Sequence, residues 1–394
     1  MVSKEILLVA GTRAEAVKIA PVAVALAGHP VLRPVIVHSG QHAGAVEQAL
    51  DAFGLAPDIT LDTPRPTGSQ AELMASLLPA FESVLGRREP AAVLVQGDTD
   101  TTLAGALAAF WRRIPVAHLE AGLRTGDLAA PFPEEGNRQM VSRIAALHLA
   151  PTEEAAAALR AERVPEREIV VTGNTVVDAV ERIADVELTA RNPALAALER
   201  DLDATEGRLV LVTVHRRESW GEPLDRVLAA VRSMVDRHPD IRVLLPAHPN
   251  PSVRDQVSAA LAGHPRIVVT EPLGYPDLVR VLRRAALVLT DSGGIQEEAP
   301  TFGVPVLVLR DATERMPAVE AGCAWLVGTD SNRILAEAGW VLGSWLRLPP
   351  GRNPFGDGSA AGRVCAALER LVGPSKSDTV ERRGATVDEL TAAS

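Results

Sequence analysis

The chain has 394 residues, which is long for a single hydrophobic core and predicts two domains. Hydrophobic residues make up 47% and charged residues 23%, as in ordinary globular proteins, and the net charge of −10 argues against a nucleic-acid-binding protein. No apolar run approaches the ~20 residues that cross a bilayer, so we expect no membrane contact and a cytoplasmic protein. The two cysteines, Cys323 and Cys365, lack the spacing of a metal site.

Runs rich in Val, Leu and Ile alternate with helical patterns through the first half of the chain. The first run, "EILLVAGTR", precedes a helical pattern, "AEAVKIAPVAVALAG", that ends at Gly28. Further strands are expected at residues 32–42, 91–98, 114–122, 146–152 and 168–174. This alternation predicts a parallel sheet with helices on both faces.

A second set of strands follows a helical connection at residues 180–207. These strands are expected at residues 208–216, 241–248, 266–272, 286–294, 304–311 and 323–330. The sequence therefore predicts two α/β domains, at residues 1–175 and 176–372, with the last helices packing back on the first domain. The remaining segment, 373–394, is rich in Ser, Lys, Thr and charge and is expected to be a disordered tail.

Ligands of open parallel sheets bind beyond the carboxyl ends of the strands. The segments that follow the expected strands are unusually polar: Gly11-Thr12-Arg13, Gln41-His42, Gly97-Asp98-Thr99, Glu120-Ala121-Gly122, His215-Arg216-Arg217-Glu218, His248 and Ser292-Gly293-Gly294. Two such edges that face each other predict one site in a cleft between the domains.

The segment "DSGGIQEEAP" combines a glycine turn with the start of a helix. Gly293 and Gly294 let backbone N–H groups approach a ligand, and a helix N-terminus favours a phosphate. Glu298, one turn further, suits the hydroxyl groups of a sugar. The alternative is a capped helix with acidic residues in its first turn, worth about 0.3–1 kcal/mol each.

The segment "GTRAEAVK" repeats this arrangement at the first strand, with Arg13 and Lys18 on the first turns of a helix. Arg13 could bind a phosphate through two parallel hydrogen bonds, although solvated basic residues are a common alternative. The segment is neither a Walker A loop nor a GxGxxG fingerprint.

Carboxylates converge in "QGDTDTT", "HLEAGLRTGD" and "PFPEEGNR". Asp98 and Glu120 stand at strand ends, and Glu134, Glu135 and Arg138 stand at a helix start. Such a cluster is costly unless it binds a ligand or moves protons, and we favour acid–base catalysis. N-capping and a Mg²⁺ site are the alternatives. In "VTVHRRESWGE", His215 ends a strand beside further charged residues and is a candidate for catalysis, although a single histidine is often structural.

Together these motifs resemble the non-hydrolysing UDP-N-acetylglucosamine 2-epimerases of bacteria. The resemblance extends from about Ile6 to Arg370 and is carried by "GTRAEAVKIAP", "QGDTDTT", "HLEAGLRTGD", "PFPEEGNR", "VTGNTVVDA", "HRRES" and "LTDSGGIQEEAPTFGVPVLVLRDATER". It implies a glycosyltransferase-B type fold, in which two Rossmann-like domains face each other across a cleft. It also implies a UDP-sugar substrate, a homodimer and no cofactor.

The resemblance implies inversion at carbon 2 of UDP-N-acetylglucosamine, with 2-acetamidoglucal and UDP as intermediates. The implied acid–base residues are Asp98, Glu120, Glu134 and His215. The implied UDP-binding residues are Arg13, Lys18, Arg138, Ser292, Gly293, Gly294 and Glu298. The residues that match an allosteric site of the family are Gln41, His42, Gln70 and Arg217.

The sequence departs from the family pattern at three positions. Ala14 replaces a usual proline, and Val214 replaces a usual glycine beside His215. Ser69 stands where a basic residue is typical, which puts allosteric activation in doubt.

Several other functions are compatible with parts of the pattern. A hydrolysing epimerase would release N-acetylmannosamine and UDP, and an epimerase for a related nucleotide sugar would need only a modified cleft. A glycosyltransferase would keep the UDP loop but would not need three clustered carboxylates. A nucleotide-sugar sensor would bind UDP without turnover.

Overall fold

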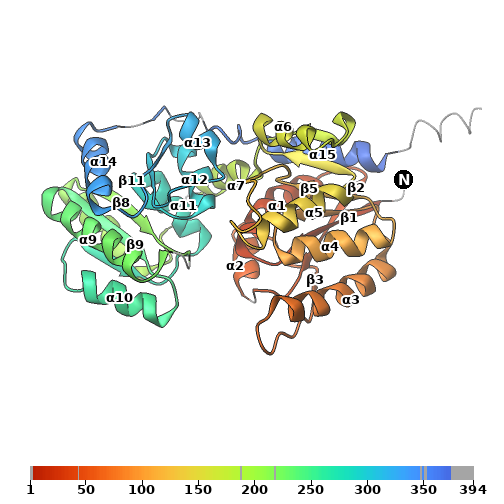
Figure 1. Cartoon of the computed structure of the whole chain (residues 1–394), viewed down its shortest axis with the longest axis horizontal. Helices are drawn as coiled ribbons and strands as arrows, with labels where there is room; N and C mark the ends of the chain where they lie inside the picture. The colour runs from red at the N-terminus through yellow and green to blue at the C-terminus, as the bar shows by residue number, and fades with distance from the viewer. Residues whose placement is uncertain are drawn as a thin grey trace, which may run out of the picture.

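The structure is a computed structural model that describes residues 3–42, 44–186, 189–216, 219–346, 348–349 and 353–373. Two lobes lie side by side, each built on a parallel sheet (Figure 1). We call them the N-terminal lobe, which contains β1–β7, and the C-terminal lobe, which contains β8–β13.

The N-terminal lobe has a seven-stranded sheet in the order β3-β2-β1-β4-β5-β6-β7, in which every pairing is parallel. Its strands are β1 (Lys4–Ala10), β2 (Leu32–His38), β3 (Ile59–Thr60), β4 (Ala92–Gln96), β5 (Val116–Leu119), β6 (Leu147–Ala150) and β7 (Ile169–Val171). Its helices are α1 (Arg13–Ala27), α2 (Ala45–Asp51), α3 (Gln70–Arg88), α4 (Asp100–Trp111), α5 (Glu134–Ile144), α6 (Glu153–Ala161) and the short 3-10 helix η1 (Glu166–Glu168).

The C-terminal lobe has a six-stranded parallel sheet in the order β10-β9-β8-β11-β12-β13. Its strands are β8 (Arg208–Thr213), β9 (Ile241–Pro246), β10 (Ile267–Thr270), β11 (Ala285–Thr290), β12 (Val306–Val308) and β13 (Ala324–Leu326). Its helices are α8 (Pro193–Thr205), α9 (Glu222–Arg237), α10 (Pro251–Leu261), α11 (Tyr275–Arg284), α12 (Gly293–Glu298), η3 (Ala299–Phe302), α13 (Met316–Glu320) and α14 (Ser331–Gly343).

Both faces of the N-terminal sheet are covered, which explains why β1 is apolar along its buried part. Ile6 and Leu8 pack in one cluster with α1, whereas Leu7 and Val9 pack in another with α3 and α4. Continuous Val, Leu and Ile runs are typical of parallel strands buried on both faces. The two parallel sheets confirm the predicted α/β architecture.

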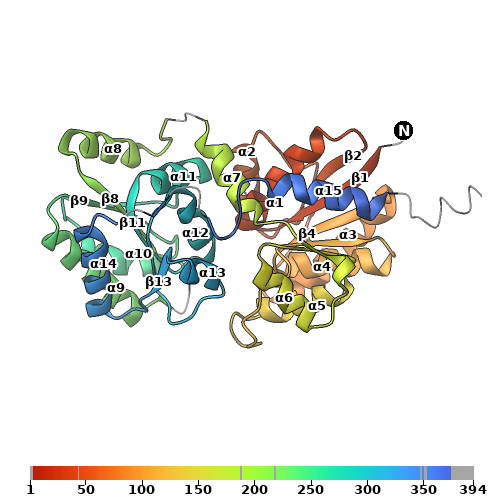
Figure 2. The same cartoon turned by 90° about the horizontal axis from the view of Figure 1, so that it is seen from above.

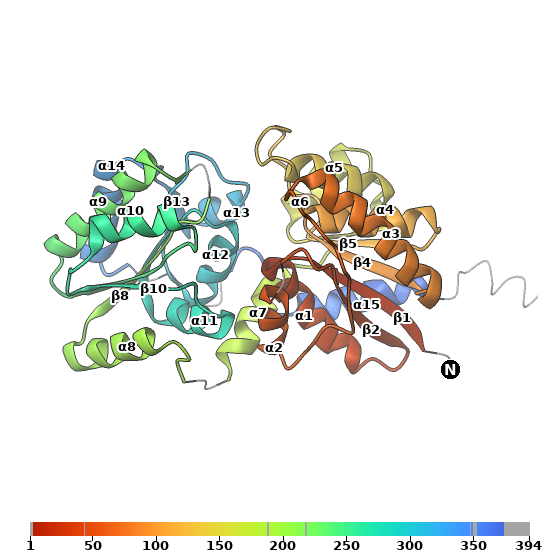
Figure 3. The ribbon, with the colours of Figure 1, turned by 90° about the horizontal axis from the view of Figure 1, so that it is seen from below.

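One helix lies between the lobes, and another returns the end of the chain to the N-terminal lobe. Helix α7 (Thr175–Ala184) packs against α1 and α15 of one side and against α11 and α12 of the other. Helix α15 (Ala360–Val372) lies beside α1 in the N-terminal lobe, although it is the last described helix (Figure 2). Seen from below, the segment between β5 and α5 projects from the N-terminal lobe on the side of the junction (Figure 3).

The strand order reverses direction between β1 and β4 in the first sheet and between β8 and β11 in the second. A ligand crevice is expected at each of these points. In the part of the chain that the structure describes, no helix is both long and apolar enough to cross a membrane.

Candidate active site

The turn after β1 is fixed by hydrogen bonds rather than by exposed charge. Thr12 caps α1, and Glu15 accepts hydrogen bonds from the N–H groups of Gly11 and Thr12 at 2.7 Å each. Glu15 also accepts a hydrogen bond from Thr99 at the start of α4, so it joins two strand ends. A side chain at Gly11 has no space, because its Cβ would lie 2.3 Å from Thr101 Oγ1. The local sequence therefore holds the β1 and β4 edges together.

The turn after β4 presents Asp98. Gly97 has a positive φ of 72°, and its carbonyl oxygen lies 2.7 Å from Nε2 of buried His118 on β5. The Asp98 carboxylate forms an ion pair with Arg138 of α5, and Asn137 donates to the Asp98 carbonyl oxygen at 3.0 Å. The N-capping alternative for Asp98 is wrong, because Thr99 caps α4.

Glu134, the first residue of α5, lies close to Asp98 in the same cavity. Burial raises the pKa of Glu134, and the charge of Asp98 adds to the increase, while Arg216 and Arg138 oppose it. This carboxyl group is therefore better able than an exposed one to hold a proton near neutral pH.

Glu120 lies in a different electrostatic environment. It follows β5 with a positive φ of 65°, which is uncommon for a residue other than glycine and is concentrated at functional sites. Gln96 and Asn174 donate hydrogen bonds to its carboxylate, and Lys18 Nζ lies 2.5 Å from Oε1. Burial would raise the pKa of Glu120, but Lys18 and Arg315 outweigh burial and lower it to about 2.

Four charged residues, which we call the interlobe cluster, join the lobes behind the cavity: Lys18, Glu120, Glu297 and Arg315. Lys18 Nζ lies 2.8 Å from Glu297 Oε2, and Arg315 Nε lies 3.0 Å from Glu297 Oε1. Arg315 Nη2 lies 3.8 Å from Glu120 Oε1. Each cation contacts both carboxylates, and all four side chains are at most 12% exposed. The cluster therefore neutralises its own charge where the two lobes meet.

The C-terminal lobe contributes a glycine turn to the site. Asp291, at the end of β11, accepts hydrogen bonds from the N–H groups of His215 and Arg216 and thereby holds the β8 edge against the β11 edge. Ser292 is the N-cap residue of α12. A Cβ at Gly293 would lie 2.9 Å from Cζ of Arg315, so only glycine lets this guanidinium approach the turn.

Glu298 and Arg13 lie together at the junction with α11. Burial raises the pKa of Glu298 to about 7, although Arg13 opposes this increase. Arg13 donates to the Leu273 carbonyl oxygen at 2.7 Å, and its guanidinium carbon lies 6.0 Å from the centre of the Tyr275 ring. Arg13 therefore crosses from α1 to the C-terminal lobe.

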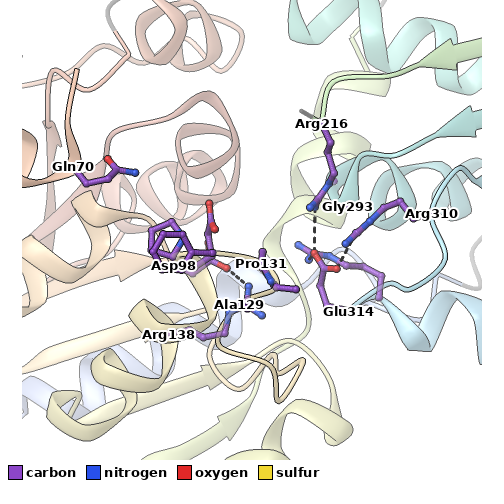
Figure 4. A pocket seen from close by; sticks show the side chains of 15 residues that line it. Gln70, Asp98, Ala129, Pro131, Arg138, Arg216, Gly293, Arg310 and Glu314 are labelled. Atoms are coloured by element: carbon purple, nitrogen blue, oxygen red, sulfur yellow. Dashed lines mark hydrogen bonds and ion pairs between the residues drawn. The ribbon is translucent and has the colours of Figure 1, made fainter. Parts of the chain in front are cut away.

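A cavity of about 890 Å³ lies between the lobes (Figure 4). Its lining residues are Gln70, Asp98, Ala129, Ala130, Pro131, Phe132, Pro133, Glu134, Arg138, Arg216, Gly293, Gly294, Arg310, Glu314 and Arg315. Glu314 pairs with Arg310 at 3.0 Å, with Arg216 at 3.5 Å and also with Arg315. The wall from the N-terminal lobe thus carries two carboxyl groups and Arg138, and the opposite wall carries three arginines around Glu314 and a glycine turn.

Five of the predicted catalytic and substrate-binding residues line this cavity: Asp98, Glu134, Arg138, Gly293 and Gly294. Lys18 and Glu120 lie behind it in the interlobe cluster, and Arg13, Ser292 and Glu298 lie at the lobe junction without lining it. His215 is also absent from the lining. Its ring centre lies 6.3 Å from that of His248, and burial lowers its pKa.

Three of the four residues considered for an allosteric site, Gln41, His42 and Gln70, lie within the described residues. Gln41 accepts a hydrogen bond from Thr101 at 2.7 Å, and burial lowers the pKa of His42. Gln70 accepts a hydrogen bond from Arg65 at 2.9 Å and lines the cavity. Arg217 lies outside the described residues.

Sequence reasoning gave no role to Glu297 or Arg315, and it missed Arg310 and Glu314. A signal was present, because "RDATER" directly follows the strand predicted at residues 304–311. The rule that identified Asp98 at a strand end applies equally to Arg310. Arg315, however, is placed by its partners in both lobes, which no local pattern reveals.

Comparison with known proteins decides the family. The family model described as UDP-N-acetylglucosamine 2-epimerase matches residues 24–369. The chain belongs to the UDP-N-acetylglucosamine 2-epimerase family. A probable UDP-N-acetylglucosamine 2-epimerase of Ralstonia solanacearum is 43% identical over 373 residues, which cover 93% of this chain and 99% of that protein. The predicted family and enzyme class, an isomerase, are confirmed.

Solved structures of this epimerase family have the same fold. A putative UDP-N-acetylglucosamine 2-epimerase from Listeria monocytogenes has a TM-score of 0.87 and 39% identity, with 95% of this chain and 98% of that chain covered. The Neisseria meningitidis epimerase, described as bound to UDP-GlcNAc, has a TM-score of 0.85 and 35% identity, with 93% and 100% covered. A Rickettsia africae glycosyltransferase, 13% identical with a TM-score of 0.61 and 95% and 100% covered, shares the fold alone. These likenesses confirm the predicted two-domain fold.

Proposed function

We propose that this member of the epimerase family inverts carbon 2 of UDP-N-acetylglucosamine and gives UDP-N-acetylmannosamine without releasing the free sugar. The observation that carries the proposal is the polarity of the cavity: Asp98 and Glu134 outnumber Arg138 on one wall, and Arg216, Arg310 and Arg315 outnumber Glu314 on the other, beside the glycine turn. This polarity suits a sugar held against carboxyl groups while its diphosphate is held by cations. The Neisseria relative described as bound to UDP-GlcNAc supports the substrate class.

The proposed reaction begins with loss of UDP. The proton on carbon 2 is not next to a carbonyl group, so a carboxylate alone could hardly remove it. Breaking the bond between carbon 1 and the diphosphate places positive charge on carbon 1 and makes the neighbouring proton more acidic. Guanidinium groups and the backbone N–H groups at the start of α12 stabilise the charge on the departing diphosphate.

Proton transfer then requires acid–base groups on both faces of the sugar ring. We propose Asp98, Glu120, Glu134 and His215 for this chemistry, with Glu134 carrying a proton and Glu120 ionised. The ammonium group of Lys18 is paired with Glu120 and Glu297. Lys18 therefore acts through these two carboxylates in the proposed reaction rather than by binding UDP directly. Arg13, Arg138, Ser292, Gly293, Gly294 and Glu298 are the proposed UDP-binding residues.

The experiment is an incubation of the protein with UDP-N-acetylglucosamine in deuterated water, followed by NMR of the products. The expected product is UDP-N-acetylmannosamine with deuterium at carbon 2, since the proton is exchanged at the active site. Free N-acetylmannosamine with UDP would support the hydrolysing alternative. An unchanged, undeuterated substrate would overturn the proposal.

Other predictions concern assembly, location and regulation. The homodimer, the cytoplasmic location, and the allosteric roles of Gln41, His42, Gln70 and Arg217 stay predictions. We also propose the domain division at residues 175 and 176. The contact of α15 with α1 supports a chain that returns to the N-terminal domain at its end.

A further inference from the structure

Arg315 lies between two charged parts of the site. Its Nε donates to Glu297 at 3.0 Å, its Nη1 pairs with Glu314, and its Nη2 lies 3.8 Å from Glu120. The same guanidinium lines the cavity and lies so close to Gly293 that a Cβ there would be 2.9 Å from Cζ. One side chain thus reaches both a carboxylate and the turn where we propose that the diphosphate binds.

We propose that Arg315 is shared between Glu120 and the departing diphosphate, and that it thereby couples loss of UDP to the basicity of Glu120. This inference rests on the proposed function. In the elimination, the bond between carbon 1 and oxygen breaks, and its electron pair stays on UDP. The carbon 2–hydrogen bond also breaks; its electron pair forms the double bond to carbon 1, and the proton moves to a carboxylate.

The growing charge on UDP attracts Arg315 toward the glycine turn. Glu120 then loses one of its two cations at the moment when a base is needed. When UDP adds back to the glucal, the carboxyl group on the opposite face of the ring gives its proton to carbon 2, the charge on UDP falls, and Arg315 returns to Glu120.

The surroundings of Glu120 support this division of roles between the two cations. The charged and titratable groups around it are Lys18 of α1, Glu297 of α12, Arg315 before α13, and His118 of β5. Lys18 does not line the cavity, whereas Arg315 does. Arg315 is therefore the cation that a bound diphosphate can reach.

Arg310 is a matched control. It lines the same cavity, and it pairs with Glu314 as Arg315 does. Among the described residues, Arg310 forms no ion pair with Glu120 or Glu297. Loss of Arg310 thus removes a similar charge from the diphosphate wall but leaves the surroundings of Glu120 unchanged.

The first experiment measures kcat/KM for UDP-N-acetylglucosamine against pH in the wild type, Arg315→Met, Arg315→Lys and Arg310→Met. Arg315→Met is expected to lower kcat by about 10²–10³-fold, as loss of a preorganised charge does. It is also expected to move the acid limb of the profile to higher pH, since Glu120 loses a stabilising cation. Arg315→Lys keeps a positive charge, and Arg310→Met leaves Glu120 paired, so both should retain the wild-type limb. An unmoved limb in Arg315→Met overturns the coupling.

A second experiment needs no turnover. UDP binding is measured by calorimetry at mildly acidic pH in two buffers with different ionisation enthalpies. The wild type should take up protons when UDP draws Arg315 from Glu120, and Arg315→Met and Glu120→Gln should take up fewer. Equal uptake by all three proteins overturns the coupling. A wild type that binds UDP without epimerising overturns the proposed function itself, so the two failures are distinguishable.

Discussion

Replacement of Lys18 by methionine tests how far the interlobe cluster holds the lobes together. Lys18 is 5% exposed, and its ammonium group lies 2.5 Å from one carboxylate and 2.8 Å from another. Removal of one partner from a buried ion pair costs about 3–5 kcal/mol, because a buried charge is left uncompensated. Arg315 still faces both carboxylates, so we expect the lower end, about 3 kcal/mol.

This loss of stability should depend on pH. Burial already raises the pKa of Glu297 in the wild type. Without Lys18, burial and mutual repulsion raise the pKa of Glu297 further and raise that of Glu120 above its unfolded value. A carboxyl group with a raised folded pKa destabilises the protein above that pKa and ceases to do so as the pH falls through it. The difference between Lys18→Met and wild type should therefore be largest at neutral pH and smaller near pH 5.

The assay is urea unfolding followed by circular dichroism at both pH values. Arg160→Met is the matched control, because Arg160 also lies between two glutamates, Glu153 and Glu166, but on the surface. Exposed ion pairs add little, so its unfolding midpoint should not change measurably. A Lys18→Met loss below about 1 kcal/mol, or one that is equal at both pH values, would refute the reasoning.

Three further predictions follow from the site. Gly11→Ala should cost about 1–3 kcal/mol in urea unfolding, because its Cβ would meet Thr101, whereas Gly28→Ala at the other end of α1 has space and should cost less. Glu298→Gln should remove a pH dependence of the free energy of unfolding. The pKa of Glu298 is raised to about 7, so this carboxyl group binds more protons in the folded than in the unfolded wild type. The wild type therefore loses up to about 3 kcal/mol of stability as the pH rises from the unfolded pKa of Glu298 to neutral. Asp98→Asn should abolish deuterium incorporation while UDP affinity measured by calorimetry stays within a few-fold; a similar loss of both would place Asp98 in binding instead.

Much of the fold was predictable because local signals agree with the tertiary structure. The pattern "AEAVKIAPVAVALAG" predicted α1, and the helix indeed ends at Ala27, with Thr12 as its N-cap and Gly28 as its C-cap. Strand β3 was missed, since two residues, Ile59–Thr60, are too few for a hydrophobic pattern. Residues 374–394, most of the predicted tail, lie outside the described residues.

The candidate site was predictable to the extent that strand ends determine it. Asp98 and Glu120 were located in this way, because β4 and β5 are neighbours and their carboxyl ends meet at one edge. The pairing of Lys18 with Glu297 could not be predicted, since it depends on how the two lobes face each other. The different electrostatic surroundings of Glu120 and Glu134 could not be predicted from the sequence for the same reason.

These surroundings give different pKa values to Glu134 and Glu120, which the sequence pattern does not distinguish. Burial with Asp98 nearby raises the pKa of Glu134, whereas Lys18 and Arg315 overcome burial and lower the pKa of Glu120 to about 2. Titratable groups whose pKa values are moved apart are suited to opposite roles, one holding a proton and one remaining ionised. Epimerisation needs both roles at once, because one face of the ring must lose a proton and the other must gain one. Lys18, which belongs to the same lobe as Glu120, lowers the pKa of Glu120 most, and Arg315, from the lobe proposed to bind the diphosphate, lowers it further. The contact between the lobes therefore widens the pKa difference between Glu120 and Glu134 on which the proposed chemistry depends.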